Sequence, residues 1–165
     1  MEIETSQRQT EAKLKIFLAE KAGDYDYVII DCPPTISIFT QAAILASNKY
    51  VVPIKPDPLS VIGLPLLERW LQDYSEDAGI DIEAVGLVYT LVRGPLPNRM
   101  RDIMEELRKE RKDAVFQSHL SLLSSVAEAV EAHEPIFRFE KSRNSKAGAQ
   151  ITSIIKEFLD RTNEG

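Results

Sequence analysis

Four short runs of apolar residues occur along the chain without alternation of apolar and polar positions. They cover residues 27–30, 50–54, 84–92 and, more weakly, 115–120. A strand that is buried on both faces needs apolar side chains at successive positions, so these runs predict a parallel sheet with helices on each side. Pro33 and Pro34 cannot donate to a strand ladder, and we therefore expect the first strand to end just before them.

Segments with apolar residues at helical spacing separate these runs and predict amphipathic helices. They cover residues 5–21, 37–47, 64–79, 99–112, 124–132 and 150–161. Pro65 has the character of a first-turn proline, which places the start of the third helix near Leu64, and Asn98 is expected to cap the fourth. The alternation of strands and helices predicts a doubly wound α/β fold with a mostly parallel sheet, in which right-handed crossovers bring all carboxyl ends of strands to one side.

Three polar residues follow or end the predicted strands at this edge, where open parallel sheets bind their ligands. They are Asp31, Lys55 and Thr90. A carboxylate at a strand end can hold a phosphate-bound Mg²⁺ through metal-bound water, and the alternative for Asp31 is a cap of the following turn. Lys55 is long enough to reach a phosphate, and a solvated lysine beside Asp57 explains it equally well.

The single cysteine, Cys32, excludes an internal disulfide and a cysteine-rich metal site. Neither His119 nor His133 is near it in the sequence, so a small buried hydrophobe is a better interpretation than a nucleophile. We expect both histidines to be ordinary packed or surface residues. No local motif pairs a cysteine with a histidine.

Length and composition limit the class of protein. The 165 residues fit one domain, and 44% hydrophobic with 28% charged residues is typical of a globular protein. The net charge of −6 and the pI near 5.0 argue against a strongly nucleic-acid-binding surface on this chain as a whole. No apolar run approaches the roughly 20 residues of a membrane span, and residues 1–23 lack the apolar core of a signal peptide. We therefore expect a cytoplasmic protein without a membrane partner.

Several motifs resemble the ParA/Soj/MinD family of P-loop ATPases. Residues 24–35, Asp-Tyr-Asp-Tyr-Val-Ile-Ile-Asp-Cys-Pro-Pro-Thr, look like that family's second nucleotide-site motif, and residues 48–57 and 59–64 look like its next strand and the loop into a helix. Glu128-Ala129, Pro135-Ile136 and residues 145–150, Ser-Lys-Ala-Gly-Ala-Gln, resemble its closing motifs. The resemblance covers nearly the whole chain, and it implies that residues 1–165 form a single α/β domain equivalent to the C-terminal two-thirds of a ParA-like ATPase.

The resemblance implies a function in partitioning plasmid or chromosomal DNA, with ATP and Mg²⁺ as cofactors. It implies a nucleotide site at Asp31, Pro33, Lys55 and Thr90, with Asp31 as the catalytic residue and the metal contact through water. It also implies a homodimer and a ParB-like partner protein.

Non-specific DNA binding is a further implication of the resemblance, and two basic segments are candidates for it. The helix over 99–112 carries six Arg or Lys residues, but glutamates and Asp113 interleave with them, which favours a solvated face that pairs with itself. The loop with Lys141, Arg143 and Lys146 has fewer acids nearby and is the better candidate, since Lys and Arg neutralise phosphates without sequence preference.

The sequence departs from the family at two places in the nucleotide site. None of the seven glycines is followed by Lys-Ser or Lys-Thr, so the first strand and the phosphate-binding loop of the fold are absent. Ser121-Leu122-Leu123 stands where the family commonly has Pro-Arg-Asn near the adenine. These departures support an alternative function, a non-catalytic ParA-like interaction or dimerisation module without nucleotide binding. We expect the isolated chain to be inactive as an ATPase.

Overall fold

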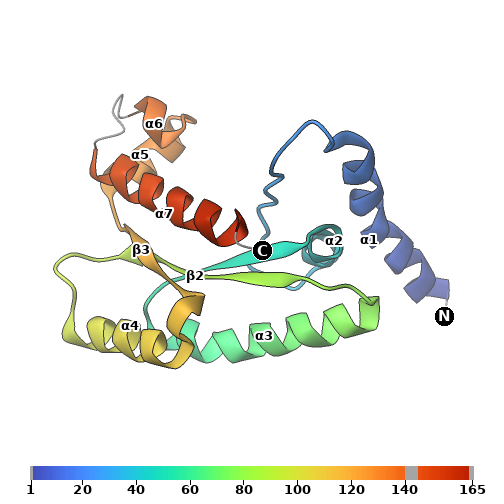
Figure 1. Cartoon of the computed structure of the whole chain (residues 1–165), viewed down its shortest axis with the longest axis horizontal. Coiled ribbons are helices and arrows are strands. Elements are labelled where there is room, and N and C mark those ends of the chain that lie inside the picture. Colours follow the sequence, from blue (N-terminus) through green and yellow to red (C-terminus); the bar gives the residue numbers. More distant parts are fainter. Residues whose placement is uncertain (1, 140–144, 164–165) are drawn as a thin grey trace. The chain divides into compact units, whose positions relative to one another are not determined.

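The computed structural model describes residues 2–139 and 145–163, which belong to two compact units. The first unit comprises Met1–Tyr50 and Arg69–Glu83, and the second comprises Val51–Glu68 and Ala84–Gly165. Figure 1 shows the elements in chain order.

The first unit is helical. Its elements are α1 (Glu2–Lys21), α2 (Ile38–Ala46) and the second half of α3 (Pro58–Ala78). The helices α1 and α2 pack against each other. The Tyr74 hydroxyl of α3 donates to the Glu11 carboxylate at 3.1 Å and lies 3.2 Å from the Gln41 carbonyl oxygen, which ties the three helices together. Glu11 is buried, so this hydroxyl contact satisfies a carboxylate that has left water.

The sheet has three strands in the order β1-β2-β3, and most of it belongs to the second unit. Its strands are β1 (Lys49–Ile54), β2 (Glu83–Val92) and β3 (Val115–Ser121), and β2 pairs with β3 in parallel. The other elements of this unit are α4 (Asn98–Arg111), the 3-10 turn η1 (Lys112–Ala114), α5 (Ser124–Glu131), α6 (Ile136–Phe139), α7 (Lys146–Asn163) and the first half of α3. The doubly wound α/β class predicted from the alternating pattern is confirmed.

Apolar clusters cover both faces of the sheet in the second unit. One cluster joins the strands to α3 and α4, and its buried members are Ile54, Leu64, Leu87, Tyr89, Val92, Met104, Leu107 and Val115. The other joins the strands to α7, and it contains Val85, Val88 and Phe116 with Val51, Ile154 and Phe158 packed against them. Figure 1 shows α7 and α4 on opposite sides of the strands. Burial of both faces explains why the strands are apolar at successive positions.

The predicted strand over residues 27–30 is wrong, because these residues have no regular secondary structure. Tyr27, Val28 and Ile29 are exposed, the last at 85% of its surface. A strand is stable only when its backbone groups pair with a neighbour, and this run is not paired into the sheet β1-β2-β3. An apolar β-rich sequence was therefore not sufficient to form a strand here.

Two expectations at helix ends are corrected, and one short helix was not predicted. Helix α3 begins at Pro58, so Pro58 is the first-turn proline and Pro65 lies inside the helix. Asn98 is the first residue of α4, whose N-cap is Pro97 without a side-chain hydrogen bond. The four-residue helix α6 (Ile136–Phe139) was not predicted, since it is too short for a periodic pattern.

Candidate functional site

Asp31 lies on the irregular segment that leads into α2, in the first unit. Its side chain is exposed, as is Pro33. The Thr35 amide donates to the Pro33 carbonyl at 2.7 Å and forms a tight turn, and Ser37 then caps α2 by accepting from the Thr40 amide at 3.5 Å. The proline pair of the motif thus leads into a tight turn, and the Asp31 side chain just before it is exposed to solvent.

Cys32 is exposed, so the expectation of a small buried hydrophobe is wrong. The reason is that the run before it does not enter the sheet. Desolvation of the sulfur raises the pKa of the Cys32 thiol, and the adjacent Asp31 carboxylate raises it further. A thiol with a raised pKa carries less thiolate at neutral pH.

Lys55 and Asp57 form an ion pair in the loop between β1 and α3, in the second unit. The Lys55 ammonium nitrogen lies 3.2 Å from Asp57 Oδ2, while Asp57 Oδ1 accepts from the Ser60 amide at 3.0 Å. The hydrogen bond from the Ser60 backbone is the main cause of the lowered pKa of Asp57, and the Lys55 ammonium lowers it further against the effect of desolvation. Asp57 therefore both caps α3 and holds Lys55.

The ends of β2 and β3 are joined to each other and to the start of α7. The Leu122 amide donates to the Val92 carbonyl at 2.8 Å. Gln150 of α7 accepts from the Ser121 amide and contacts the Ser121 hydroxyl, both at 2.9 Å. Thr90 is half-buried within β2. These contacts give the Ser121 amide and hydroxyl their hydrogen-bond partners.

Of the three basic residues predicted to bind DNA, Lys146 is the one that the structure describes. It is exposed and begins α7, whose first turn is capped by the Ser145 hydroxyl at 3.0 Å from the Gly148 amide. Lys141 and Arg143 lie outside the described residues. On α4, Arg111 forms an ion pair with Glu68 of α3 at 2.9 Å.

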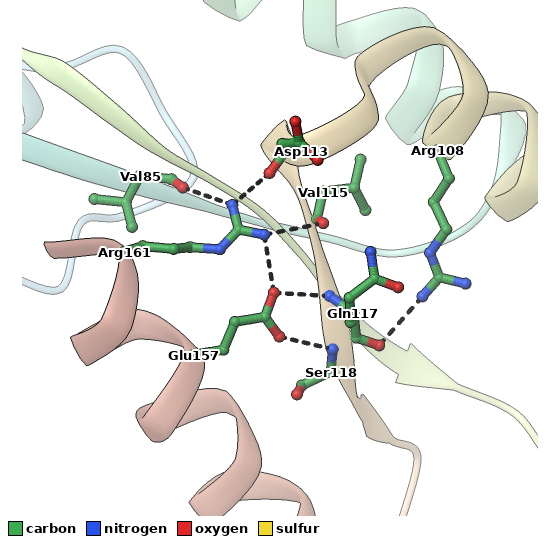
Figure 2. Close-up of polar contacts among 8 residues, drawn as sticks. All are labelled: Val85, Arg108, Asp113, Val115, Gln117, Ser118, Glu157 and Arg161. Atoms are coloured by element: carbon green, nitrogen blue, oxygen red, sulfur yellow. Dashed lines mark hydrogen bonds and ion pairs between the residues drawn. The ribbon is translucent and has the colours of Figure 1, made fainter. Parts of the chain in front are cut away.

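The sequence pattern did not predict a polar network of the second unit that is centred on Arg161 of α7 (Figure 2). Its guanidinium donates to the carbonyl oxygens of Val85 at 3.1 Å, Asp113 at 2.6 Å and Val115 at 3.1 Å. It also pairs with Glu157 at 2.8 Å and lies 4.2 Å from the centre of the Phe116 ring. An arginine near the end of an amphipathic helix gives no sequence signal that distinguishes this anchor from a solvated residue.

Glu157 completes the network by accepting hydrogen bonds from the amides of Gln117 at 2.8 Å and Ser118 at 2.9 Å (Figure 2). Desolvation raises the pKa of Glu157, but the hydrogen bonds from Ser118, Gln117 and Arg161 outweigh it and hold the pKa below its ordinary value. The carboxylate thus covers an edge of β3 that would otherwise have unpaired amides.

The described residues fit one part of an ATP–Mg²⁺ site. Asp31 offers an exposed carboxylate, the ligand type that Mg²⁺ accepts directly or through water. The phosphate cradle is different, because the sequence contains no Gly-Lys-Ser or Gly-Lys-Thr and Lys55 is paired with Asp57. Among the described residues, no three His, Cys, Asp or Glu side chains gather as a metal cluster. Among the described residues, the exposed Asp31 carboxylate is thus the group whose chemistry fits the metal side of such a site.

A family model described as "AAA domain" (AAA_31) matches residues 1–83, which is half of the chain. Two curated relatives match most of it. The sporulation initiation inhibitor protein Soj of Bacillus subtilis is 27% identical over 146 residues, which cover 88% of this chain and 57% of Soj. The chromosome partitioning protein ParA of Myxococcus xanthus is 26% identical over 156 residues, which cover 94% of this chain and 54% of that ParA. The chain thus spans little more than half the length of these relatives.

Solved structures share the fold. The ATP complex of Cyanothece McdA matches 96% of this chain and 61% of its own with a TM-score of 0.76, at 15% sequence identity. In the part of the chain that the structure describes, no helix is both long and apolar enough to cross a membrane.

Proposed function

Because the chain belongs to the AAA domain family AAA_31, with relatives such as Soj and ParA along most of its length, we propose that it is the C-terminal part of a ParA-like ATPase that partitions DNA. The observation that carries the proposal is the extent of the similarity, 88% to 94% of the chain. It includes the Asp-Cys-Pro-Pro motif, whose carboxylate the fold leaves exposed.

In this proposal, Asp31 holds Mg²⁺ through a metal-bound water and is the catalytic residue of the complete site. Mg²⁺ held there would neutralise charge that develops on the transferred phosphoryl group. Pro33 limits the conformations of the segment that carries Asp31, and Lys55 and Thr90 contribute to the nucleotide side. The ion pair with Asp57 would then have to open before Lys55 reaches a phosphate.

The remaining parts of the proposal concern partners. By analogy with the partitioning relatives, the protein acts in the cytoplasm as a homodimer, binds DNA non-specifically through Lys141, Arg143 and Lys146, and responds to a ParB-like protein. The exposure of Lys146 at the start of α7 supports a contact with a polyanion.

A second candidate function is a non-catalytic interaction module of ParA type. It is favoured by the Gln150 contacts that occupy the Ser121 end of β3. Such a module would keep the packing and association surfaces without binding nucleotide.

Phosphate release with and without Mg²⁺ tests the ATPase. We expect the 165-residue chain to show no turnover above background, since positioning by the phosphate loop and its lysine is what phosphoryl transfer requires. Fusing the phosphate-loop segment of Soj ahead of residue 1 should restore Mg²⁺-dependent turnover, which Asp31→Ala should abolish.

Asp24→Ala is the matched control, because Asp24 is an exposed aspartate of the same segment. Turnover that persists in the Asp31 variant would remove the catalytic role of that carboxylate. A fusion that folds but never binds or hydrolyses ATP would favour the non-catalytic module.

Titration of labelled duplex DNA tests the DNA contact. Three phosphate contacts imply a slope of roughly −2 to −3 in log K against log salt, with weak affinity of about 10⁻⁴ to 10⁻⁶ M. Replacing Lys141, Arg143 and Lys146 together by Ala should abolish this binding. Unchanged binding would exclude the loop, and no binding by either form would favour the interaction module.

A further inference from the structure

His119 of β3 lies near two cations, Arg108 and Lys146, and forms no ion pair with a carboxylate of the described residues. Its position on β3 pairs in register with Tyr89 of β2, and its side chain is half-buried. Arg108 of α4 places its guanidinium 5.5 Å from the centre of the Tyr89 ring and donates to the Gln117 carbonyl at 3.3 Å. Arg108 of α4 and His119 of β3 therefore both lie beside Tyr89, in the second half of β3.

Lys146 reaches this region from the other side of the sheet. Gln150 binds both the amide and the hydroxyl of Ser121, which places the first turn of α7 beside the end of β3. Lys146 precedes Gln150 by four residues and shares its side of the helix. The capped N-terminus of α7 adds a partial positive charge at the same place.

The charges in this cluster are not balanced within the described residues. Neither Arg108 nor Lys146 forms an ion pair with a described carboxylate. Arg108 Nε is buried without a hydrogen-bond partner in the described part of the chain, a state that costs free energy unless a ligand satisfies the group. Glu157 is the first acidic residue after Lys146 on α7, and its carboxylate already accepts hydrogen bonds from amides of β3 and from Arg161.

The electrostatics of His119 agree with this arrangement. Burial lowers the pKa of His119, and the positive charges of Arg108 and then Lys146 lower it further. At neutral pH the ring is therefore neutral, with one nitrogen free to donate and one to accept. A nearby anion would favour the imidazolium and reverse the effect of the two cations.

We propose that Arg108, His119 and Lys146 form a binding site for a phosphate group at the end of β3. Arg108 offers a planar fork, Lys146 a mobile point charge and His119 a ring N–H, which together suit the oxygens of one phosphate. The site shares Lys146 with the DNA contact proposed above but does not depend on it. The phosphate can come from a nucleic-acid backbone or from a small phosphorylated ligand.

Proton NMR of the two histidines tests the site in the native chain. His119→Gln assigns the His119 ring signal, and His133 serves as an internal reference because it is exposed and lies on the turn after α5. Saturating pyrophosphate should raise the pKa of His119 by about one and leave His133 unchanged. The proposal would be overturned if neither pyrophosphate nor short duplex DNA changed the pKa of His119 by more than it changed that of His133.

A parallel titration with short duplex DNA distinguishes the two sources of phosphate. A response to the duplex assigns the site to a nucleic-acid backbone, and a response to pyrophosphate alone assigns it to a small ligand; either supports the site. If the triple Ala variant above leaves DNA binding unchanged while pyrophosphate still shifts His119, the DNA proposal fails and the phosphate site stands.

Variants separate a built site from general attraction. Lys146→Gln should weaken pyrophosphate binding about two- to fivefold, as expected for an exposed charge. Lys156→Gln removes an equal charge from an exposed position on the same helix and should have no effect. Arg108→Gln should weaken binding about tenfold. Equal losses with Lys146→Gln and Lys156→Gln would show non-specific attraction and contradict the proposal.

Discussion

At the scale of single residues, Arg161 joins several segments of the second unit. It hydrogen-bonds carbonyl oxygens of β2, η1 and β3 from its place on α7. We predict that Arg161→Met lowers the free energy of unfolding by about 2 kcal/mol, because the methionine keeps apolar bulk but leaves carbonyl groups without a donor. Urea unfolding measures this, with Arg101→Met at an exposed position of α4 as the control. An equal effect of both variants would exclude a special role for the anchor.

Gly86 makes room for this anchor. Its φ is 142°, and an added Cβ would lie 2.5 Å from the Ala114 carbonyl oxygen and 2.9 Å from Arg161 Nη1. Gly86→Ala should therefore destabilise the protein by about 2 kcal/mol. Gly63→Ala, in α3 with nothing within 4 Å of the new methyl group, should instead stabilise it by about 0.5 to 1 kcal/mol. Thermal unfolding of both variants compares the two signs, and a neutral Gly86→Ala would contradict the close approach.

Glu157 should make stability depend on acid. Its pKa is lowered in the folded chain, so its stabilising contribution is complete above the ordinary value of 4.5 and is lost as the pH falls through the folded-state pKa. We predict that Glu157→Gln is less stable than the native chain at pH 6 and that this difference shrinks as the pH falls below 4.5. Asp160→Asn removes an exposed charge of the same helix and should show no such convergence. A difference that is constant with pH would contradict the prediction.

At the scale of elements, Asp57 controls where α3 begins. It accepts from the Ser60 amide, which is the contact of an N-cap, and Pro58 follows it as the first helical residue. Asp57→Ala should lower the midpoint of urea unfolding, whereas Asp57→Asn should lower it less because the amide oxygen still accepts the bond. Equal losses in the two variants would indicate that the Lys55 ion pair, rather than the cap, provides the stabilisation.

Local pattern was sufficient for most elements of this fold and insufficient where a partner decides. The run over 84–92 became β2 because neighbours pair with it on both sides, as the order β1-β2-β3 requires. The run over 27–30 has a similar apolar pattern but is not paired into that sheet. The hydrophobic pattern predicts which residues are buried, but it does not predict whether a neighbouring strand is present.

The candidate sites divide in the same way. Asp31 was found because a motif of adjacent residues marks it. The roles of His119, Arg108 and Arg161 depend on contacts between separate elements. The register of β2 and β3 places His119 beside Tyr89, and the packing of α4 and α7 brings Arg108 to Tyr89 and Arg161 to Val115. No spacing in the sequence encodes such a cluster, so these roles could be inferred only from the fold.

At the scale of the whole molecule, exposed apolar side chains predict self-association. Tyr25, Ile29 and Phe39 of the first unit are exposed at 70%, 85% and 74%, although they belong to β-rich or helical apolar sequence. Apolar surface of this extent and unpaired strand-forming residues are both routes by which copies of a chain associate. We therefore expect sedimentation velocity to show a weight-average coefficient that rises with concentration.

Ile29→Lys should weaken this association, because a charge on the run over 27–30 opposes both apolar contact and strand pairing between copies. Val130→Lys is the matched control. Val130 is 69% exposed on α5 of the second unit, and its replacement by lysine adds the same charge. If Val130→Lys reduces association as much as Ile29→Lys, then net charge rather than the run over 27–30 governs it. A chain that sediments as a cooperatively folding monomer at every concentration would contradict the prediction, since the run would then tolerate water without a partner of any kind.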